Sequence, residues 1–596
     1  MLYTAAAECA PFAALLREAL ENHPSSPDSP WQLIVYCDEI GHNPLLTTDP
    51  RKSQCIYWSL LEFGCQFLAC EDAWFVAAAV RSTIVEEIES GMSQLMRIVL
   101  TELFFNDVSG HNFSTGGATL QIMGMNNPVV IFAKIKCIIA DEKALKELWG
   151  CLGASAFKFC GACANVVKHT TPPEKLGSYL PSTCLDLTRI REHTDDTVRA
   201  IVRELRNLSV EREAGRVTTE HVKTMQYHYG YKHLPNGLLQ DEHLAVRGRS
   251  NLHYDYYHIY FVSGIFQKEL QGLTTFLAAE NFSVDRITAF LKQWEWPRTS
   301  VNASKMFADW HINSDHIKCD AHVCTTSYEI LAFFVSSVII PSGVCVAQCT
   351  SFLKLCDVVD LLMAGRHGNV DPKRLLTAIV THLCAHLRAY GILVWVPKFH
   401  ASTHLANQVA ALRAVVGCNI HEIRHKLIKR WTRDRFNTAG FESGCIEEVT
   451  LQHLYNLKKS MMGEGLVDAA PPTGKLRASM MEVCGCGVAE TARVARTNGR
   501  AFSAGDFAFV RRDGRLSLAR MLFHVKLEDG FRTCLSELQD APSPSDNEWC
   551  QTFRQTDNTY VVDTACLVAP VTHYSRGNMI VALVPAIVRM QSCAAS

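Results

Sequence analysis

The order of secondary-structure signals in the first quarter of this 596-residue chain constrains its fold more than any other feature. Three apolar runs of strand length come first and are followed by a run with helical spacing. The most β-like run of the sequence comes next, and it leads directly into a second helical run. Alternation of this kind favours an α/β core. The predicted elements are strands at 31–38, 55–61 and 74–80, a helix at 86–105, a strand at 129–140 and a helix at 142–149.

Residues 150–410 have a different character, because long runs with helical periodicity dominate them. Pro471 and Pro472 then stand in a Gly-, Ala- and Thr-rich stretch that is typical of a linker. Short β-like runs between turns fill the last hundred residues and predict a small β-barrel. The predicted helices are 195–208, 256–278, 284–294, 328–340, 345–364, 372–390 and 420–436, and the predicted late strands are 506–511, 518–525, 560–567 and 579–585.

These signals together predict an α/β core that a large all-α insertion divides, with a small β-rich, barrel-like domain after it. The expected segments are the first part of the core at 1–150, the helical insertion at 151–410, the closing helices of the core at 411–460, a linker at 461–500 and the β-rich domain at 501–596.

Composition is that of an ordinary globular protein, with 48% hydrophobic and 20% charged residues. The formal net charge of −2 gives no overall attraction to nucleic acid, so any DNA contact must come from local basic patches. Residues 1–22 do not read as a secretory signal, so we expect an intracellular protein whose 24 cysteines are reduced. The most apolar stretch, 330–346, is short and is broken by serines and Pro341, which favours a buried helix over a membrane span.

Two acids stand at positions where a carboxylate is costly unless it binds a metal or a partner. Asp38 ends the first predicted strand, and Asp141 directly follows the fourth. Carboxylates that bridge two Mg²⁺ (or Mn²⁺) ions would suit phosphodiester cleavage, because the ions activate water and stabilise the leaving oxygen. Capping of the helix that begins at 142 would also explain Asp141, and both interpretations stay open at this point.

Two further motifs have the residue types of a metal site. Cys160 and Cys163 form a C-x₂-C pair, and His400 and His404 form an H-x₃-H pair that would lie on one helical face. Two thiolates and two imidazoles make a closed tetrahedral Zn²⁺ site, which here would clamp the two ends of the long insertion. The alternative for the histidines is a pair satisfied within the core.

The ordering Asp, Asp, C-x₂-C, helical insertion, H-x₃-H, Glu resembles the eukaryotic DDE transposases with an all-α insertion. These include the Plavaka, CACTA and Kyakuja-Dileera-Zisupton types and the related catalytic subunit of the V(D)J recombinase. In that subunit, as here, the zinc cysteines follow the second catalytic aspartate and the zinc histidines precede the catalytic glutamate. Cys160 comes 19 residues after Asp141, and Glu422 comes 18 after His404.

The resemblance covers roughly residues 30–450, and it implies a ribonuclease-H-like core, two Mg²⁺ ions, a zinc ion and a nuclear setting. A ribonuclease-H-like sheet has the strand order found here and needs acids after its first and fourth strands. The catalytic residues implied are Asp38, Asp141 and Glu422. The implied activity is cleavage and strand transfer of double-stranded DNA, with a homo-oligomer left open.

Glu422 stands at the start of a basic helix, so it could hold metal while its neighbours contact phosphates. A solvated amphipathic helix with i, i+4 pairs such as Glu422–Lys426 is the alternative. The residues predicted to contact DNA are Arg424, Lys426, Lys429, Arg430 and Arg433.

Asp255 and His258 resemble the D-x-x-H element of CACTA-type enzymes, but their position within the insertion favours a structural role. The first predicted strand begins only thirty residues from Met1, which leaves no room for the usual N-terminal DNA-binding domain. The competing functions are therefore an active DNA-cleaving enzyme, a catalytically silent DNA- or chromatin-binding protein derived from a transposase, and a metal-free helical scaffold.

Overall fold

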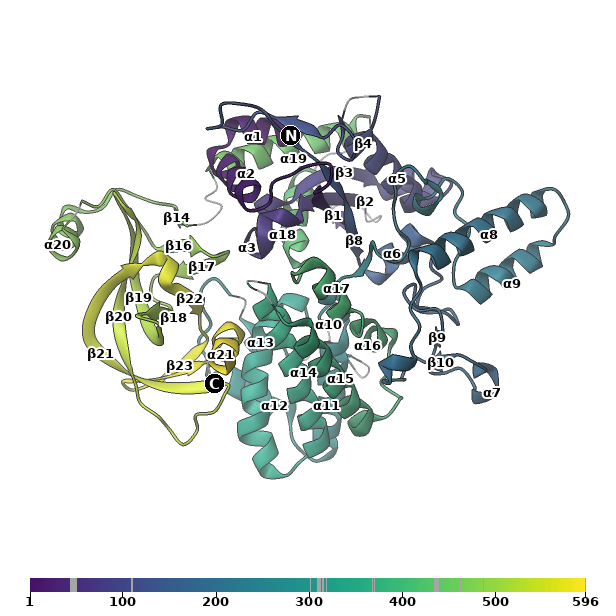
Figure 1. Ribbon diagram of the computed structural model, residues 1–596. Coiled ribbons are helices and arrows are strands. Elements are labelled where there is room, and N and C mark those ends of the chain that lie inside the picture. Colours follow the sequence, from purple (N-terminus) through teal and green to yellow (C-terminus); the bar gives the residue numbers. More distant parts are fainter. Residues whose placement is uncertain are drawn as a thin grey trace. The chain divides into compact units, whose positions relative to one another are not determined.

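The computed structural model groups the chain into two compact units, each assembled from separate segments of the sequence (Figure 1). The first unit comprises Met1–Ile259, Trp395–Leu412 and Val416–Met462, and the second comprises Tyr260–Val394, Arg413–Val415 and Gly463–Ser596. The structure describes residues 1–42, 51–108, 111–300, 302–307, 312–313, 316–317, 319–366, 368, 370–432, 439–459, 464–485 and 487–594.

A five-stranded mixed sheet forms the centre of the first unit, with the strand order β3-β2-β1-β8-β11. β1 pairs antiparallel with β2, and β2 with β3, whereas β8 runs parallel to both β1 and β11. This arrangement confirms that the chain contains an α/β core. The strands are β1 (Trp31–His42), β2 (Arg51–Leu60), β3 (Phe75–Arg81), β8 (Ala133–Ala140) and β11 (Leu252–Tyr254).

The predicted boundaries of the first and fourth strands differ from the structure. β1 continues to His42, beyond the acid expected to end it, because Glu39–His42 pair with β2. Asp38 therefore lies inside a strand, opposite Cys55. The run 129–140 divides into β7 (Val129–Ile131), which pairs with β6 (Ala118–Leu120), and β8.

Helices on the sheet of the first unit position the late segments of the chain. α6 (Glu142–Trp149) begins directly after β8, as predicted. α18 (Asn419–Thr432) packs against β1, and α19 (Phe441–Lys459) packs against β3. His421 fixes α18 in place, because its ring stacks on Tyr36 at 3.9 Å and meets Trp74 edge-on at 4.2 Å.

The predicted insertion, 151–410, does not behave as one body. Residues 151–259 group with the sheet, and they include a helical hairpin of α8 (Asp195–Glu213) and α9 (Thr219–Tyr229). The predicted helix 256–278 is divided into α10 (Tyr256–Tyr260) and α11 (Ile265–Ala279). The break falls where Ser263 adopts a positive φ of 46°, which a helix cannot accommodate.

In the second unit, α14 (Val346–Gly365) and α15 (Pro372–Tyr390) follow the sequence prediction closely, whereas α13 (Ala321–Phe334) begins seven residues before its predicted start at 328. One stretch among the described residues, Ala321–Ser342, is long and apolar enough to cross a membrane, but 56% of it is buried, as in the core helix of a globular protein. The described α-helices between residues 261 and 394 are α11, α12 (Val284–Leu291), α13, α14 and α15, and α21 (Ala586–Ala594) lies at the end of the chain.

Strands fill the C-terminal part of the second unit, in the order β22-β18-β19-β20-β21-β24-β23. The linker prediction for 461–500 is wrong, because this segment contains β14 (Gly465–Val467), α20 (Gly474–Cys484) and β16 (Val494–Thr497). The other strands are β15 (Glu490–Ala492), β17 (Arg500–Ser503), β18 (Phe507–Arg512), β19 (Arg515–Leu527), β20 (Gly530–Asp540), β21 (Cys550–Asp563), β22 (Leu567–Pro570), β23 (His573–Arg576) and β24 (Met579–Leu583).

Candidate functional site

Asp38 of β1 and Glu422 of α18 come together although almost four hundred residues separate them. One ligand atom from each of Asp38, Glu422 and His425 lies within 4.8 Å of the other two, a spacing at which they could hold a metal ion. The stacking of His421 on Tyr36 places the start of α18 over β1, so the next residue, Glu422, lies beside Asp38.

Asp141 lies next to this group but outside it. Cys37 pairs with Ala140 across the parallel strands β1 and β8, so Asp38 and Asp141 are the next residues of neighbouring strands. The Asp141 carboxylate also caps α6, because its Oδ1 accepts a hydrogen bond of 2.6 Å from the Ala144 amide. The capping interpretation left open by the sequence is therefore correct for one of its two oxygens.

Burial and neighbouring charges act in opposite directions on the two converging carboxylates. Burial raises the pKa of Asp38, the nearby His425 and His258 lower it, and the charge of Asp141 raises it further. The nearby His425, whose Nδ1 lies 3.8 Å from Glu422 Oε2, lowers the pKa of Glu422. A cation would relieve the repulsion between the Asp38 and Asp141 carboxylates. Neighbouring carboxylates therefore favour the binding of a metal ion.

A second cluster, formed by Asp255, His258 and Cys418, adjoins the acids. The Asp255 carboxylate contacts His258 Nδ1 at 2.5 Å and accepts a hydrogen bond of 3.1 Å from the Cys418 amide. Burial lowers the pKa of His258, but Asp255 and the more distant Asp38 and Asp141 raise it to about 8. Asp255 thus ties the start of α10 to the segment before α18.

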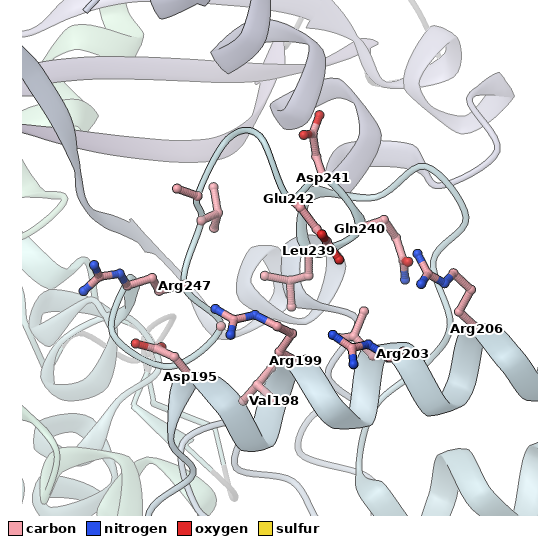
Figure 2. A pocket seen from close by; sticks show the side chains of 14 residues that line it. Asp195, Val198, Arg199, Arg203, Arg206, Leu239, Gln240, Asp241, Glu242 and Arg247 are labelled. Carbon is pink, nitrogen blue, oxygen red and sulfur yellow. The ribbon is translucent and has the colours of Figure 1, made fainter. Parts of the chain in front are cut away.

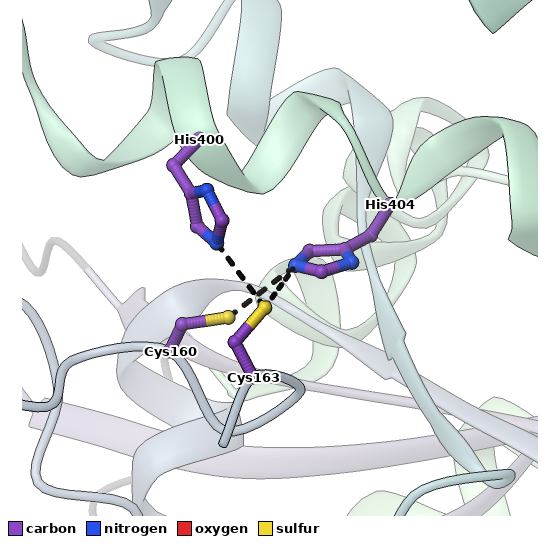
Figure 3. Close-up of side chains that lie close together, drawn as sticks. All are labelled: Cys160, Cys163, His400 and His404. Carbon is purple, nitrogen blue, oxygen red and sulfur yellow. Dashed lines mark hydrogen bonds between the residues drawn. The ribbon is translucent and has the colours of Figure 1, made fainter. Parts of the chain in front are cut away.

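The Cys₂His₂ residues, Cys160, Cys163, His400 and His404, converge in the same unit and are all buried (Figure 3). His404 Nε2 lies 3.4 Å from each of the two sulfurs, and His400 Nε2 lies 3.4 Å from Cys163 Sγ. The two histidines come from α16 (Pro397–Ser402) and the turn after it, as Figure 3 shows. This cluster could hold a metal ion.

Contacts with neighbouring side chains orient two of these four residues, His404 and Cys160. Glu192 Oε1 accepts from His404 Nδ1 at 3.1 Å, and Arg249 holds the other oxygen of Glu192 at 2.6 Å. Tyr254 OH lies 3.3 Å from Cys160 Sγ. Burial raises the pKa of the Cys160 thiol, but Cys163 and His404 lower it well below its usual value, whereas the contact with Cys160 raises the pKa of Cys163, so the thiolate that a metal needs is favoured at Cys160.

One pocket in the first unit borders both the Cys₂His₂ cluster and the cluster of Asp255, His258 and Cys418. Its lining includes Cys160, Asp255 and His258, together with Asp141 and Lys398. The Lys398 ammonium donates to the carbonyl of His258 at 2.9 Å.

The basic residues predicted to contact DNA differ in their exposure. Lys426 and Arg430 are exposed, and Lys429 is half-buried. Arg424 is only 2% exposed and its nearest acid is Asp72, at 4.0 Å, so the prediction of a phosphate contact there is wrong. It fails because Arg424 is on the face of α18 that packs on the sheet. Arg433 lies outside the described residues.

Three contributors to these clusters were not predicted from the sequence. His425 could have been found from its i, i+3 spacing to Glu422. Glu192 and Cys418 had no such signal, because each partner lies more than a hundred residues away. Comparison with known proteins finds no matching family model and no matching curated protein.

Proposed function

We propose that this chain is a transposase-derived enzyme that cleaves double-stranded DNA and transfers its strands with a metal-dependent DDE site. The observation that carries the proposal is the convergence of Asp38 and Glu422. Their ligand atoms lie within 4.8 Å of each other although almost four hundred residues separate them in the sequence. A glutamate far from the two early aspartates would have removed the basis for a nuclease site.

The sheet supports a ribonuclease-H-like core. Three antiparallel strands come first, and β8 then lies parallel beside β1, so the acids of the first and fourth predicted strands are neighbours. The helix α5 (Gly91–Phe104), which lies between β3 and β8 in the sequence, completes the expected order of elements. The barrel expected for residues 501–596 stays a prediction.

The residues of the first unit would divide the work as follows. Asp38, Asp141 and Glu422 would hold Mg²⁺ or Mn²⁺ through their carboxylate oxygens. When bound, these ions supply an activated water and stabilise the charge of the leaving oxygen. The exposed Lys426 and Arg430 would contact DNA phosphates, which are bound largely without regard to sequence.

We propose Zn²⁺ as the ion of the Cys₂His₂ cluster. Tetrahedral zinc with Zn–S of about 2.3 Å and Zn–N of about 2.0 Å separates sulfur from nitrogen by about 3.5 Å. The Cys160–His404 and Cys163–His400 separations of 3.4 Å fit that value. Glu192 is the carboxylate partner that metal-bound histidines commonly have. Nuclear localisation and self-association remain parts of the proposal.

A catalytically silent DNA-binding protein is the second candidate. The observation in its favour is that Asp141 caps α6 and lies outside the group formed by Asp38, Glu422 and His425. Such a protein would keep its basic surface and its zinc but would have no strand-cleaving activity.

Incubation of the purified full-length protein with a labelled duplex and Mg²⁺ or Mn²⁺ tests the proposal. We expect nicked or cleaved strands, and a rate about a thousandfold lower in Asp38→Asn and Glu422→Gln, which corresponds to roughly 4 kcal/mol. Asp141→Asn should lose activity to a similar degree if its second oxygen binds metal.

Glu447→Gln is the matched control, because Glu447 is an exposed acid on the next helix, α19. It should cleave at the wild-type rate. Cleavage that survives the Asp38 and Glu422 substitutions would come from another site or a contaminant and would refute the proposal. Duplex binding without cleavage by the wild type would favour the silent protein.

A further inference from the structure

Three arginines on α8 share one face of the helix. Arg199, Arg203 and Arg206 recur at spacings of four and three residues, which brings them into one row. All three are exposed. The row is about 10 Å long, since seven residues separate its ends and each rises about 1.5 Å.

The row forms one wall of a pocket whose other wall is the loop of residues 239–248 (Figure 2). Arg247 joins from that loop, so two separate elements contribute cationic groups to one concavity. Arg199 has an ion pair with Asp196, whose side chain is 87% exposed. Within the described part of the chain, no side-chain hydrogen bond or salt bridge engages the guanidinium groups of Arg203, Arg206 and Arg247.

Three acids also line the pocket, but two of them are already engaged. Asp195 accepts hydrogen bonds from the Ser250 hydroxyl and from the Arg249 and Ser250 amides; burial raises its pKa, but these bonds lower it below the usual value. Asp241 accepts from two amides of its own loop and pairs with Arg97 at 3.5 Å. Glu242 is exposed and makes no such contact among the described residues, and the charge of Asp195 also acts on Arg247, so these two acids weaken the positive charge of the pocket.

We propose that this arginine pocket, defined by Arg199, Arg203, Arg206 and Arg247, binds the sugar-phosphate backbone of duplex DNA. Guanidinium groups match phosphate oxygens in charge and geometry. Phosphates of one strand rise about 3.4 Å each along the helix axis, so a row of about 10 Å spans roughly three of them. The choice of DNA as the occupant rests on the proposed function, whereas the anion site itself rests on the arginines alone.

The dependence of DNA binding on salt tests this assignment. The full-length protein and its Arg199→Gln/Arg203→Gln/Arg206→Gln variant are titrated with a fluorescent 30-base-pair duplex at several salt concentrations, without added divalent ion. The slope of log affinity against log salt is negative, and each lost phosphate contact should reduce its magnitude by about 0.9. For the triple variant we therefore expect a slope smaller in magnitude by about 2 to 3, and at least about tenfold weaker binding. Glu242→Gln should tighten binding by about threefold.

Arg212→Gln/Arg216→Gln is the matched control, because these arginines lie at and beyond the far end of α8, face Glu213 and Glu211, and do not line the pocket. An unchanged slope in the triple variant, or an equal fall in the control, would overturn the assignment. A fluorescent oligoglutamate peptide that binds more tightly than the duplex and is lost in the triple variant would also overturn it, in favour of an acidic protein partner.

The two proposals can fail separately. A wild type that cleaves DNA with a salt slope insensitive to the triple variant refutes the pocket and leaves the nuclease. A wild type that binds with the expected fall in slope but never cleaves refutes the nuclease and leaves the pocket.

Discussion

Two buried pairs of histidines in this chain have the same spacing and different surroundings. His400 and His404 in the first unit meet two sulfurs, with nitrogen–sulfur separations of 3.4 Å. His382 and His386 on α15 of the second unit meet a carboxylate instead. Their ring nitrogens lie 3.2 and 2.6 Å from one oxygen of the fully buried Glu269.

The distances assign the two pairs to different chemistry. The nitrogen–sulfur separation of 3.4 Å is close to the distance of about 3.5 Å expected between two ligands of one zinc ion. A separation of 2.6 Å is that of a charge-assisted hydrogen bond. Ser351 donates to the other oxygen of Glu269, so the carboxylate is surrounded by donors. The H-x₃-H motif alone therefore does not identify a metal site; its partners from distant segments decide.

Of the changes that distinguish the two histidine pairs, removal of a thiol should have the largest effect on metal content and stability. Cys160→Ser should reduce bound zinc from about one ion per chain to none, and should greatly destabilise the first unit, because structural zinc contributes about 10–16 kcal/mol of apparent binding energy. Elemental analysis by mass spectrometry measures the ion. His382→Asn should retain it, and a loss of metal in that variant would show that the Glu269 cluster binds an ion too.

Removal of Glu269 should come next in size. Glu269→Ala should lower the free energy of unfolding by about 3–5 kcal/mol, because it leaves two imidazoles and a hydroxyl buried without their acceptor. Denaturant titration of the full chain, with and without a chelator, measures it. Glu280→Ala, an exposed acid just past the end of α11, is the matched control and should be neutral. Chelator sensitivity that disappears with Glu269 would contradict a purely hydrogen-bonded cluster.

Loss of the carboxylate behind His404 should have a smaller effect. Glu192→Gln should weaken zinc binding by about 10- to 100-fold, since the amide no longer holds the imidazole and Arg249 as the carboxylate does. Competition with a colorimetric chelator gives the affinity. An unchanged affinity would mean that the two cysteines and two histidines are oriented without it.

The smallest effect should appear in mild acid. Burial raises the pKa of Glu269, but His382 and His386 lower it to about 2, below the value of 4.5 in the unfolded chain. A depressed folded-state pKa stabilises the protein above 4.5, and the contribution is lost as pH falls toward 2. We expect almost no change in the stability difference between wild type and Glu269→Gln from pH 7 to 5, and a decrease of about 1 kcal/mol by pH 4. A decrease already complete at pH 5 would contradict the depressed pKa.

Local patterns in the sequence were enough to predict much of the core and the four residues of the Cys₂His₂ cluster. Periodicity identified α6 and α15 to the residue, because apolar spacing and flanking caps are local properties. The strand pairing that extends β1 past Asp38, and the packing that buries Arg424, depend on neighbours from other segments. Propensity could not reveal them, and the same holds for Glu192, which is 212 residues from the histidine it contacts.

His404 lies 244 residues after Cys160, so the ribosome makes the cysteines of this cluster well before its histidines. At about 5–20 residues per second, a ribosome needs roughly 12–50 s to deliver the second half of the ligand set after the first. During that interval the two thiols have left the ribosome without their histidines, open to oxidation or to capture by the wrong ion. If they are to bind a metal, the thiols must therefore stay reduced until about two-thirds of the chain is made.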